Sequence, residues 1–360
     1  MEVKVSMEII AYYLAQFHPI AENNAYWGDG FTEWHNVAKA RPLFPGHVQP
    51  NLPGKLGFYD LRCEEVLMEQ MQLAKDFGVT TFCFWHYWFA GKRILHDPMD
   101  RMLQLPDNGI KFMLGWANES WSGIWHGASN SVFIEQTYND QEVDNHAKLI
   151  ADYMQTGRFL KVNDRYPFVI YKPRLIPDVK NYLIKFKQLV KKYSGEELYL
   201  IGNWGPGRTQ IITKPNDFGL DAVVITPVAA YFESRLMNIA YAGAWRFARK
   251  LGIGPEIRGF TSLNDIQHRA IKEIDGIAHA TIVTGWDNTP RSGRNGLVLV
   301  NYNSQTFTEH AANSISLEQK NAEQLLFLKS WNEWAEGNTI EPLFKESWSV
   351  GKTLSRLLKS

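Results

Sequence analysis

Residues 80–88 read TTFCFWHYW, an unbroken run of apolar and β-branched side chains that ends in aromatic and polar ones. Such a run is typical of a strand buried on both faces, as parallel strands are when helices cover the sheet. Seven further runs along the chain have the same character. The full set covers residues 8–14, 80–88, 111–117, 167–173, 198–204, 221–227, 280–287 and 325–331. Eight parallel strands are the number that a closed barrel of the TIM type requires.

Helical periodicity separates several of these runs. It covers residues 63–77, 141–156, 177–193, 236–251, 263–275 and 345–358. In the third stretch, Pro177 suits a first helical turn and Gly195 follows the end. The alternation predicts an α/β fold, a single (β/α)₈ TIM barrel domain over residues 1–360 with its active site at the carboxyl ends of the strands. Glycine- and proline-rich segments around the sixth strand leave a doubly wound open sheet as the alternative.

Charge and composition restrict the partners. Lys plus Arg (38) equals Asp plus Glu (38), so no broad positive field favours nucleic acid or an anionic membrane. The longest apolar run is about half of the roughly 20 residues that a membrane helix needs, and the first residues lack a signal-peptide pattern. We therefore expect a cytoplasmic protein without a membrane span. Neither cysteine nor histidine spacing resembles a zinc site, so we expect no metal and no cofactor. The oligomeric state stays open.

Aromatic residues make up 13% of the chain, with 13 Trp, 15 Tyr and 20 Phe. Aromatic faces pack against the C–H face of a sugar ring, whereas a large aromatic core would give the same count. Both interpretations remain open on composition alone.

Clusters of polar and aromatic side chains follow six of the expected strands, at residues 31–34, 86–88, 116–119, 203–204, 286–288 and 331–334. The carboxyl ends of barrel strands meet at one rim, so these clusters predict one shared cleft. We expect the following side chains to bind an oligosaccharide or polysaccharide there: Tyr12, His18, Glu33, Trp34, His86, Tyr87, Trp88, Trp116, Asn118, Glu119, Trp204, Trp286, Asp287, Asn332 and Trp334. About half of the six tryptophans in this set should be exposed in the cleft.

Cleavage of a glycosidic bond uses a proton donor and a second carboxylate. Glu333 and Glu336 lie three residues apart after the last strand, and two close carboxyls disfavour double ionisation. The structural alternative makes Glu336 a helix cap or a surface acid and Glu333 a partner of the backbone. Glu119 with Glu333 is a rival catalytic pair. Near the seventh strand, we assign Asp287 to substrate binding and Arg291 to a structural ion pair.

Several motifs together resemble the WbsX-like proteins, which are similar to glycoside hydrolase family 99. They lie at residues 11–19, 30–34, 84–89, 116–119 and 331–337. The resemblance implies a (β/α)₈ barrel that acts on α-mannosides with retention, through a 1,2-anhydro sugar. It further implies that Glu333 deprotonates the 2-hydroxyl of the sugar and that Glu336 protonates the departing oxygen.

These expectations combine into a retaining, metal-independent glycoside hydrolase that acts on an α-linked, mannose-like bacterial glycan, with a transglycosylase as a variant of the same chemistry. One alternative is a glycosyltransferase that uses nucleotide sugars to build bacterial surface polysaccharide such as O-antigen. The other is a barrel that binds carbohydrate without catalysis. The glycine-rich segments do not match a phosphate-binding loop, so nucleotide binding has no positive signal in the sequence.

Overall fold

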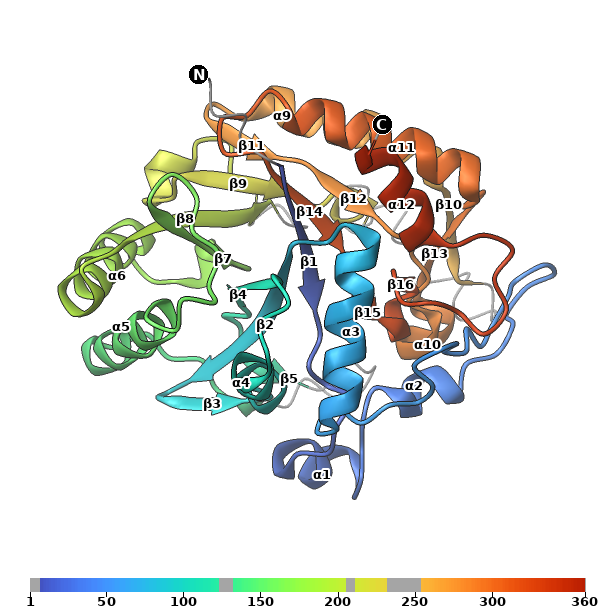
Figure 1. Cartoon of the computed structure of the whole chain (residues 1–360), viewed down its shortest axis with the longest axis horizontal. Helices are drawn as coiled ribbons and strands as arrows, with labels where there is room; N and C mark the ends of the chain where they lie inside the picture. Colours follow the sequence, from blue (N-terminus) through green and yellow to red (C-terminus); the bar gives the residue numbers. More distant parts are fainter. Residues whose placement is uncertain (1–6, 123–131, 205–210, 232–253, 360) are drawn as a thin grey trace.

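A computed structural model describes residues 7–122, 132–204, 211–231 and 254–359. At its centre nine parallel strands curl into a nearly closed barrel (Figure 1), in the order β11-β9-β8-β7-β4-β2-β1-β14-β12. Their bounds are β1 Glu8–Tyr13, β2 Thr81–Phe89, β4 Lys111–Trp116, β7 Arg165–Ile170, β8 Glu197–Trp204, β9 Ala222–Ile225, β11 Ile277–His279, β12 Thr281–Val283 and β14 Leu325–Lys329. A short strand, β3 (Lys92–Ile94), pairs antiparallel with β2.

The two ends of the sheet are joined by one stretch of chain. Strand β11 pairs with β9 and β12 pairs with β14, and only Ala280 separates β11 from β12. The carbonyl of Ala280 accepts a hydrogen bond from the amide of Phe327 at 3.1 Å. The expected run 280–287 is therefore correct only in part, because its strand structure begins earlier and ends at Val283. The other seven expected runs each overlap a strand.

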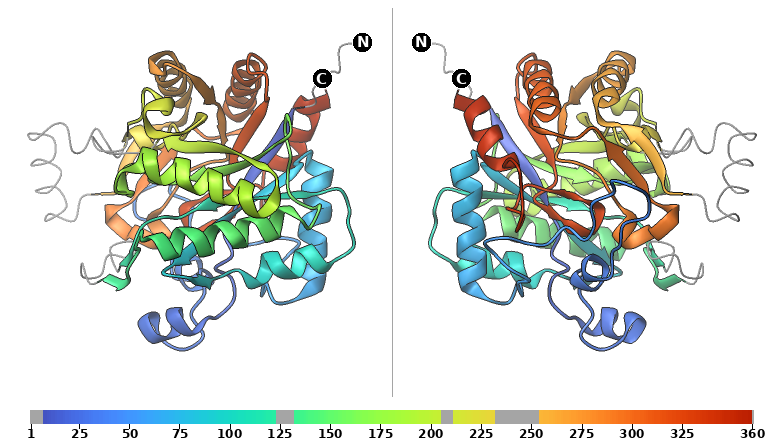
Figure 2. Two further views of the ribbon diagram at one scale, coloured as in Figure 1. Left: turned by 90° about the vertical axis from the view of Figure 1, so that its left-hand side faces the viewer. Right: turned by 90° about the vertical axis from the view of Figure 1, so that its right-hand side faces the viewer.

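Helices cover the outside of the sheet, as Figures 1 and 2 show. The longest are α3 Glu64–Phe77, α5 Asp140–Met154, α6 Val179–Ser194, α9 Leu263–Glu273, α11 Ser304–Glu318 and α12 Val350–Lys359. Five of them were predicted, and the stretch 236–251 lies outside the described residues. Helix α11 was missed because much of its buried side is polar, with His310, Ser314 and Glu318 all buried.

Shorter elements shape the loops. They are α1 Ala21–Trp27, α2 Trp34–Ala38, α4 Asp97–Gln104, α10 Thr289–Ser292, β5 Trp121–Ser122, β6 Val132–Ile134, β10 Glu256–Gly259, β13 Leu297–Val300, β15 Asn332–Glu333 and β16 Asn338–Thr339. Single turns of 3₁₀ helix are η2 Pro173–Leu175, η3 Pro215–Phe218, η4 Phe260–Ser262, η5 Gly293–Asn295 and η6 Trp334–Glu336. Among the described residues, no helix is both long enough and apolar enough to cross a bilayer.

The inside of the barrel is filled by side chains. Ile10, Cys83, Val169 and Phe327 belong to one buried cluster there, and Tyr12 stacks on Trp85 within it. A barrel packed in this way has no open channel, so a substrate reaches it only at an end. A cleft opens at the end of the barrel where the carboxyl ends of the strands lie.

Candidate active site

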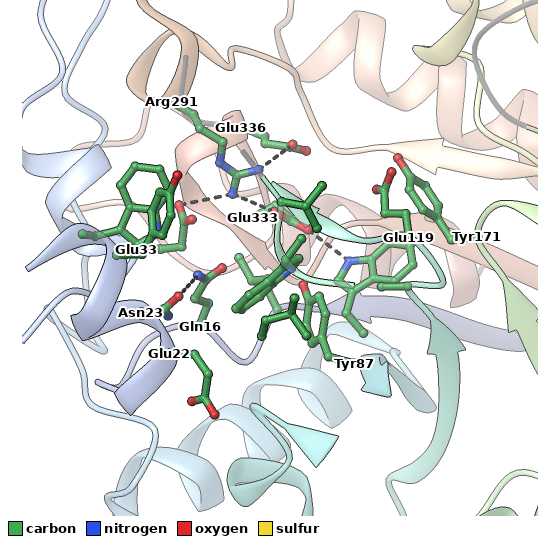
Figure 3. Close-up of a pocket in the computed structure, with 18 of the residues that line it drawn as sticks. Gln16, Glu22, Asn23, Glu33, Tyr87, Glu119, Tyr171, Arg291, Glu333 and Glu336 are labelled. Atoms are coloured by element: carbon green, nitrogen blue, oxygen red, sulfur yellow. Dashed lines mark hydrogen bonds and ion pairs between the residues drawn. The ribbon is translucent and has the colours of Figure 1, made fainter. Parts of the chain in front are cut away.

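A cleft of about 520 Å³ lies at the carboxyl ends of the strands (Figure 3). Its lining comes from residues within or after β1, β2, β4, β7, β12 and β14, so distant segments of sequence do converge on one site. Five of the expected site residues line it: Glu33, Tyr87, Glu119, Glu333 and Glu336. A volume of this size falls in the usual range for small-molecule sites.

A tight turn brings Glu333 and Glu336 to the same cleft. Glu333 ends β15, the 3₁₀ turn η6 carries Glu336, and β16 returns antiparallel to β15. Gly337 follows with a φ of +63°, and a Cβ there would lie 2.8 Å from the backbone nitrogen of Asp287. Only glycine fits this conformation and this close approach without strain. Since α12 begins at Val350, Glu336 does not cap that helix, and with a side chain only 12% exposed it is not a surface acid, so that structural alternative is wrong for Glu336.

Glu333 is a buried carboxyl with few partners. Its Oε1 accepts a hydrogen bond from the indole Nε1 of Trp85 at 3.1 Å, and its Oε2 lies 3.5 Å from a guanidinium nitrogen of Arg291. Burial, followed by the charge of Glu336, raises the pKa of Glu333 to about 7. Arg291 and Lys329 oppose this rise without cancelling it. Glu333 therefore gains or loses its proton near neutral pH.

Glu336 has stronger cationic partners. Nη1 of Arg291 lies 2.8 Å from its Oε1, Nζ of Lys329 lies 3.5 Å from its Oε2, and the amide of Asn338 donates to Oε2 at 3.4 Å. Burial by itself would raise the pKa of Glu336, but Lys329 and Arg291 outweigh it and lower the pKa. The two glutamates thus occupy different electrostatic environments within one turn of chain.

The structure corrects the role expected for Asp287, whereas Arg291 forms the ion pairs expected for it, at a position that lines the cleft. Asp287 does not line the cleft, because its oxygens accept hydrogen bonds from His47 (2.7 Å), Gln49 (2.6 Å) and Thr289 (2.6 Å). It is a structural residue that fixes loops. Arg291 lines the cleft and contacts Glu336 and Glu333, as given above. Sequence spacing could not reveal these contacts, since it shows neither the partners of Asp287 nor those of Arg291.

Glu119 lies on the other side of Glu333 from Glu33 (Figure 3). It forms an ion pair with Lys172, and burial raises its pKa although Lys172 opposes the rise. No direct contact joins Glu119 to Glu333 in the part of the chain that the structure describes. The two carboxyls of a glycosidase lie about 5 Å or more apart, so this missing contact does not exclude the rival pair. What distinguishes Glu333 and Glu336 is that both contact Arg291.

Aromatic side chains form the walls of the cleft. Trp85, Tyr87 and Tyr171 come from the barrel, whereas Trp121 comes from β5 and Trp27 from α1. The sequence reasoning missed all of these except Tyr87. The period of a strand places Trp85 on the same face as Tyr87, because side chains two residues apart share a face, but it does not say which face of β2 lines the cleft.

The six tryptophans expected to stack on sugar are all buried. Their exposed fractions are Trp34 8%, Trp88 6%, Trp116 0%, Trp204 5%, Trp286 6% and Trp334 1%. Among the described residues none of the six lines the cleft, so the expectation that about half would be exposed there is wrong. The aromatic excess serves both packing and the cleft, through different residues.

The alternation of side chains along β2 explains why His86 and Trp88 do not line the cleft. His86 and Trp88 point to the helical side of the strand, opposite to Tyr87. Nε2 of His86 lies 3.0 Å from Nε2 of His146, and Trp88 stacks on the same imidazole at 5.1 Å. Burial lowers the pKa of His86 to about 3, so the ring stays neutral. His86 packs the barrel against α5 and does not line the cleft.

Four further residues that were expected in the cleft do not line it but form hydrogen bonds with neighbouring parts of the chain. Asn332 bonds the backbone of Leu14 with both amide atoms, at 2.7 and 2.9 Å, and Asn118 does the same for Lys172. The indole of Trp334 donates to Glu341 at 2.7 Å, and that of Trp34 donates to the carbonyl of Tyr59 at 2.7 Å.

Tyr12, His18, Trp116, Trp204 and Trp286 are also buried away from the cleft lining. Tyr12 lies under Trp85 with the rings 4.8 Å apart. Burial lowers the pKa of His18. We therefore assign this group a packing role.

Solved structures with a similar fold are described as a glycoside hydrolase or as a protein similar to one. The GH99 endo-alpha-mannosidase from Bacteroides thetaiotaomicron is 15% identical, with a TM-score of 0.57 over 98% of this chain and 96% of that one. A glycoside hydrolase-like protein is 16% identical, with a TM-score of 0.58 over 100% and 95%. At these identities the likeness concerns the fold.

Sequence relatives lead to the family. The uncharacterized protein WxcX of Xanthomonas campestris pv. campestris is 34% identical over 343 residues, which are 93% of this chain and 47% of that protein. The copy in a second strain gives the same values. The chain thus spans about half the length of these curated relatives. Residues 9–349 match the family described as glycosyltransferase WbsX, and the chain therefore belongs to the glycosyltransferase WbsX family.

Proposed function

We propose that this chain is a retaining glycoside hydrolase that cleaves an α-linked, mannose-like glycan with Glu333 and Glu336. The family and the fold support a carbohydrate-active enzyme. The observation that carries the finer proposal is that two carboxyls with unequal environments face one cleft with aromatic walls. An acid and a base that are ready at the same pH are what glycoside cleavage requires.

The proposed reaction has two steps. In the first, the ionised carboxylate of Glu333 takes the proton of the sugar 2-hydroxyl, O2 attacks C1, the bond from C1 to the departing oxygen breaks, and Glu336 protonates that oxygen. The product is a 1,2-anhydro sugar. In the second, Glu336 takes a proton from water, the water oxygen attacks C1, the bond from C1 to O2 breaks, and O2 recovers its proton from Glu333. Two inversions at C1 give net retention, and no carboxylate of the protein is a nucleophile.

The proposed reaction starts with the proton on Glu336, but in the cleft without substrate the single proton of the pair favours Glu333. Arg291 and Lys329 keep Glu336 ionised, so the form that starts the reaction is a minority of the singly protonated pair. Both forms contain one proton and exchange it, so activity follows the two macroscopic pKa values of the pair. We keep the roles that the family resemblance implies, and leaving-group effects on the two glutamates test them.

The family description favours a second candidate, a transferase that takes a nucleotide sugar. A diphosphate needs cations or helix N-termini to bind it. Arg291 and Lys329 line the cleft, but both contact carboxylates, and nearby Lys172 pairs with Glu119. Within the described parts of the chain this arrangement supports a neutral substrate instead.

We further propose that residues 1–360 form one (β/α)₈ domain. The nine strands give this number when β11 and β12, separated by Ala280, count as one interrupted strand.

The test is release of reducing ends from α-linked oligosaccharides by the native protein, with Glu333→Gln and Glu336→Gln as strongly impaired controls. Calorimetry with nucleotide sugars runs in parallel. Saturable binding of a nucleotide sugar with transfer to an acceptor would replace the hydrolase proposal. Glycan binding without release of reducing ends would indicate the non-catalytic barrel.

A further inference from the structure

Arg291 occupies the centre of a cluster of three carboxylates (Figure 3). Its Nη1 lies 2.8 Å from Glu336, and its Nη2 lies 3.2 Å from Glu33 and 3.5 Å from Glu333. The Arg291 side chain is only 12% exposed and Glu33 is 1% exposed. One guanidinium therefore joins segments that follow β1, β12 and β14.

The backbone around Arg291 is fixed to the turn that carries the glutamates. Asp287 accepts hydrogen bonds from the amide and hydroxyl of Thr289 at the start of α10, and its own amide donates to the carbonyl of Glu336 at 2.7 Å. Arg291 follows two residues later on the same short helix. The guanidinium and the Glu336 carboxylate thus have their positions set by both backbone and side-chain contacts.

A guanidinium suits this position better than an ammonium. Its planar fork presents separate nitrogens in different directions, so it can bond Glu336 on one side and Glu33 on the other. A lysine is a point charge that serves one partner at a time. Three buried carboxylates with no central cation would repel one another and take up protons.

The contacts are unequal for the two proposed catalytic groups. Glu336 has Arg291 at 2.8 Å and Lys329 at 3.5 Å, whereas Glu333 has Arg291 at 3.5 Å and the neutral indole of Trp85. The other titratable groups that act on Glu333 or line the cleft are Glu22, Tyr26, Glu33, Tyr87, Glu119 and Tyr171. None of these six supplies a positive charge, so Arg291 and Lys329 create the asymmetry.

We propose that Arg291 is a positioning residue that holds Glu333 and Glu336 in the cleft and decides which of them is ionised before substrate binds. Glu33 anchors the guanidinium from the side of β1. This proposal rests on the proposed function only in taking the two glutamates as the catalytic pair. The ionisation that it assigns belongs to the free protein and can be measured without turnover.

The experiment is a titration of the glutamate side-chain carboxyls by ¹³C NMR in the free protein, with Glu333→Gln and Glu336→Gln to assign the signals. In Arg291→Met we expect Glu336 to titrate about 1–3 pH units higher, since loss of a close opposite charge has that effect. The ascending limb of kcat/KM against pH should move the same way. Arg291→Lys should restore part of the shift.

The matched control is Arg101→Met, which removes the same charge from a surface pair with Asp97 and should move neither signal. An unchanged Glu336 titration in Arg291→Met, or a loss of activity by one factor at every pH, would overturn the proposal and indicate a structural role. If Arg291→Met does not fold, Arg291→Lys and Arg291→Gln provide the comparison. Failure of the proposed function looks different: the native protein cleaves no glycan while the NMR shift is still present.

Discussion

The indole of Trp85 is the one neutral side chain that donates a hydrogen bond to Glu333 within the described structure, at 3.1 Å. Replacing Trp85 with Phe keeps a ring on Tyr12 and removes the donor. A hydrogen bond to a charged group contributes about 1.5–3 kcal/mol, and 1.36 kcal/mol corresponds to one pH unit. Trp85 borders the open cleft, where water can replace part of the bond, so we take the lower figure.

The pKa of Glu333 should then rise from about 7 to roughly 8, because the ionised form loses its donor. Above that pKa the pair loses its last proton and activity falls. The descending limb of kcat/KM against pH should therefore move up by about one pH unit in Trp85→Phe. The assay is a pH series of initial rates on one α-linked oligosaccharide.

Trp121→Phe is the matched control, because Trp121 also lines the cleft and has no hydrogen bond to Glu333. It should weaken binding through lost ring area and leave the limb in place. A limb that stays unchanged in Trp85→Phe, or moves equally in both variants, would refute the electrostatic account of Glu333.

Two further predictions concern the neighbours of the pair. In Glu33→Gln the descending limb should move to lower pH, since the charge of Glu33 raises the pKa of Glu333, and a pH series of rates checks this; movement to higher pH would contradict it. Gly337→Ala should destabilise the fold by about 2–4 kcal/mol in urea unfolding, from the positive φ plus the close contact with Asp287. Gly157→Ala has a similar φ of +69° in open space and should cost only about 1 kcal/mol; equal losses would show that the contact with Asp287 is unimportant.

The strands were predictable because buried parallel strands leave continuous apolar runs in the sequence. The bounds predicted for the strand at 280–287 were wrong because the sheet closes there with a break at Ala280. The break arises because β11 pairs with β9 whereas β12 pairs with β14, and the sequence does not show these pairings. Helix α11 was missed for a different reason. Its buried Glu318 accepts hydrogen bonds from the backbone amides of Ala280 and Leu325, so a polar side chain occupies a buried position on the side of the helix that faces the barrel.

The site was predictable where its residues lie close together in the sequence, as Glu333 and Glu336 do in one turn. It was not predictable where function depends on which side of a strand a residue faces. Trp85 faces the cleft while His86 next to it faces α5, and the sequence does not say which side is inward. The roles of Asp287 and Arg291 depend on partners far along the chain, such as His47 and Glu33.

The central claim is that Glu336 donates the proton and Glu333 is the base for the 2-hydroxyl. The measurement is kcat/KM of Glu336→Gln and Glu333→Gln on two α-glycosides that differ only in leaving group, an alkyl alcohol and a dinitrophenol. With the alcohol, Glu336→Gln should lose roughly 10²–10⁴ in rate, whereas with the phenol, which departs as a stable anion, the loss should largely disappear. Glu333→Gln should be slow with both. Recovery of Glu333→Gln by the phenol, with Glu336→Gln slow on both substrates, would contradict the assignment and exchange the roles of the two glutamates.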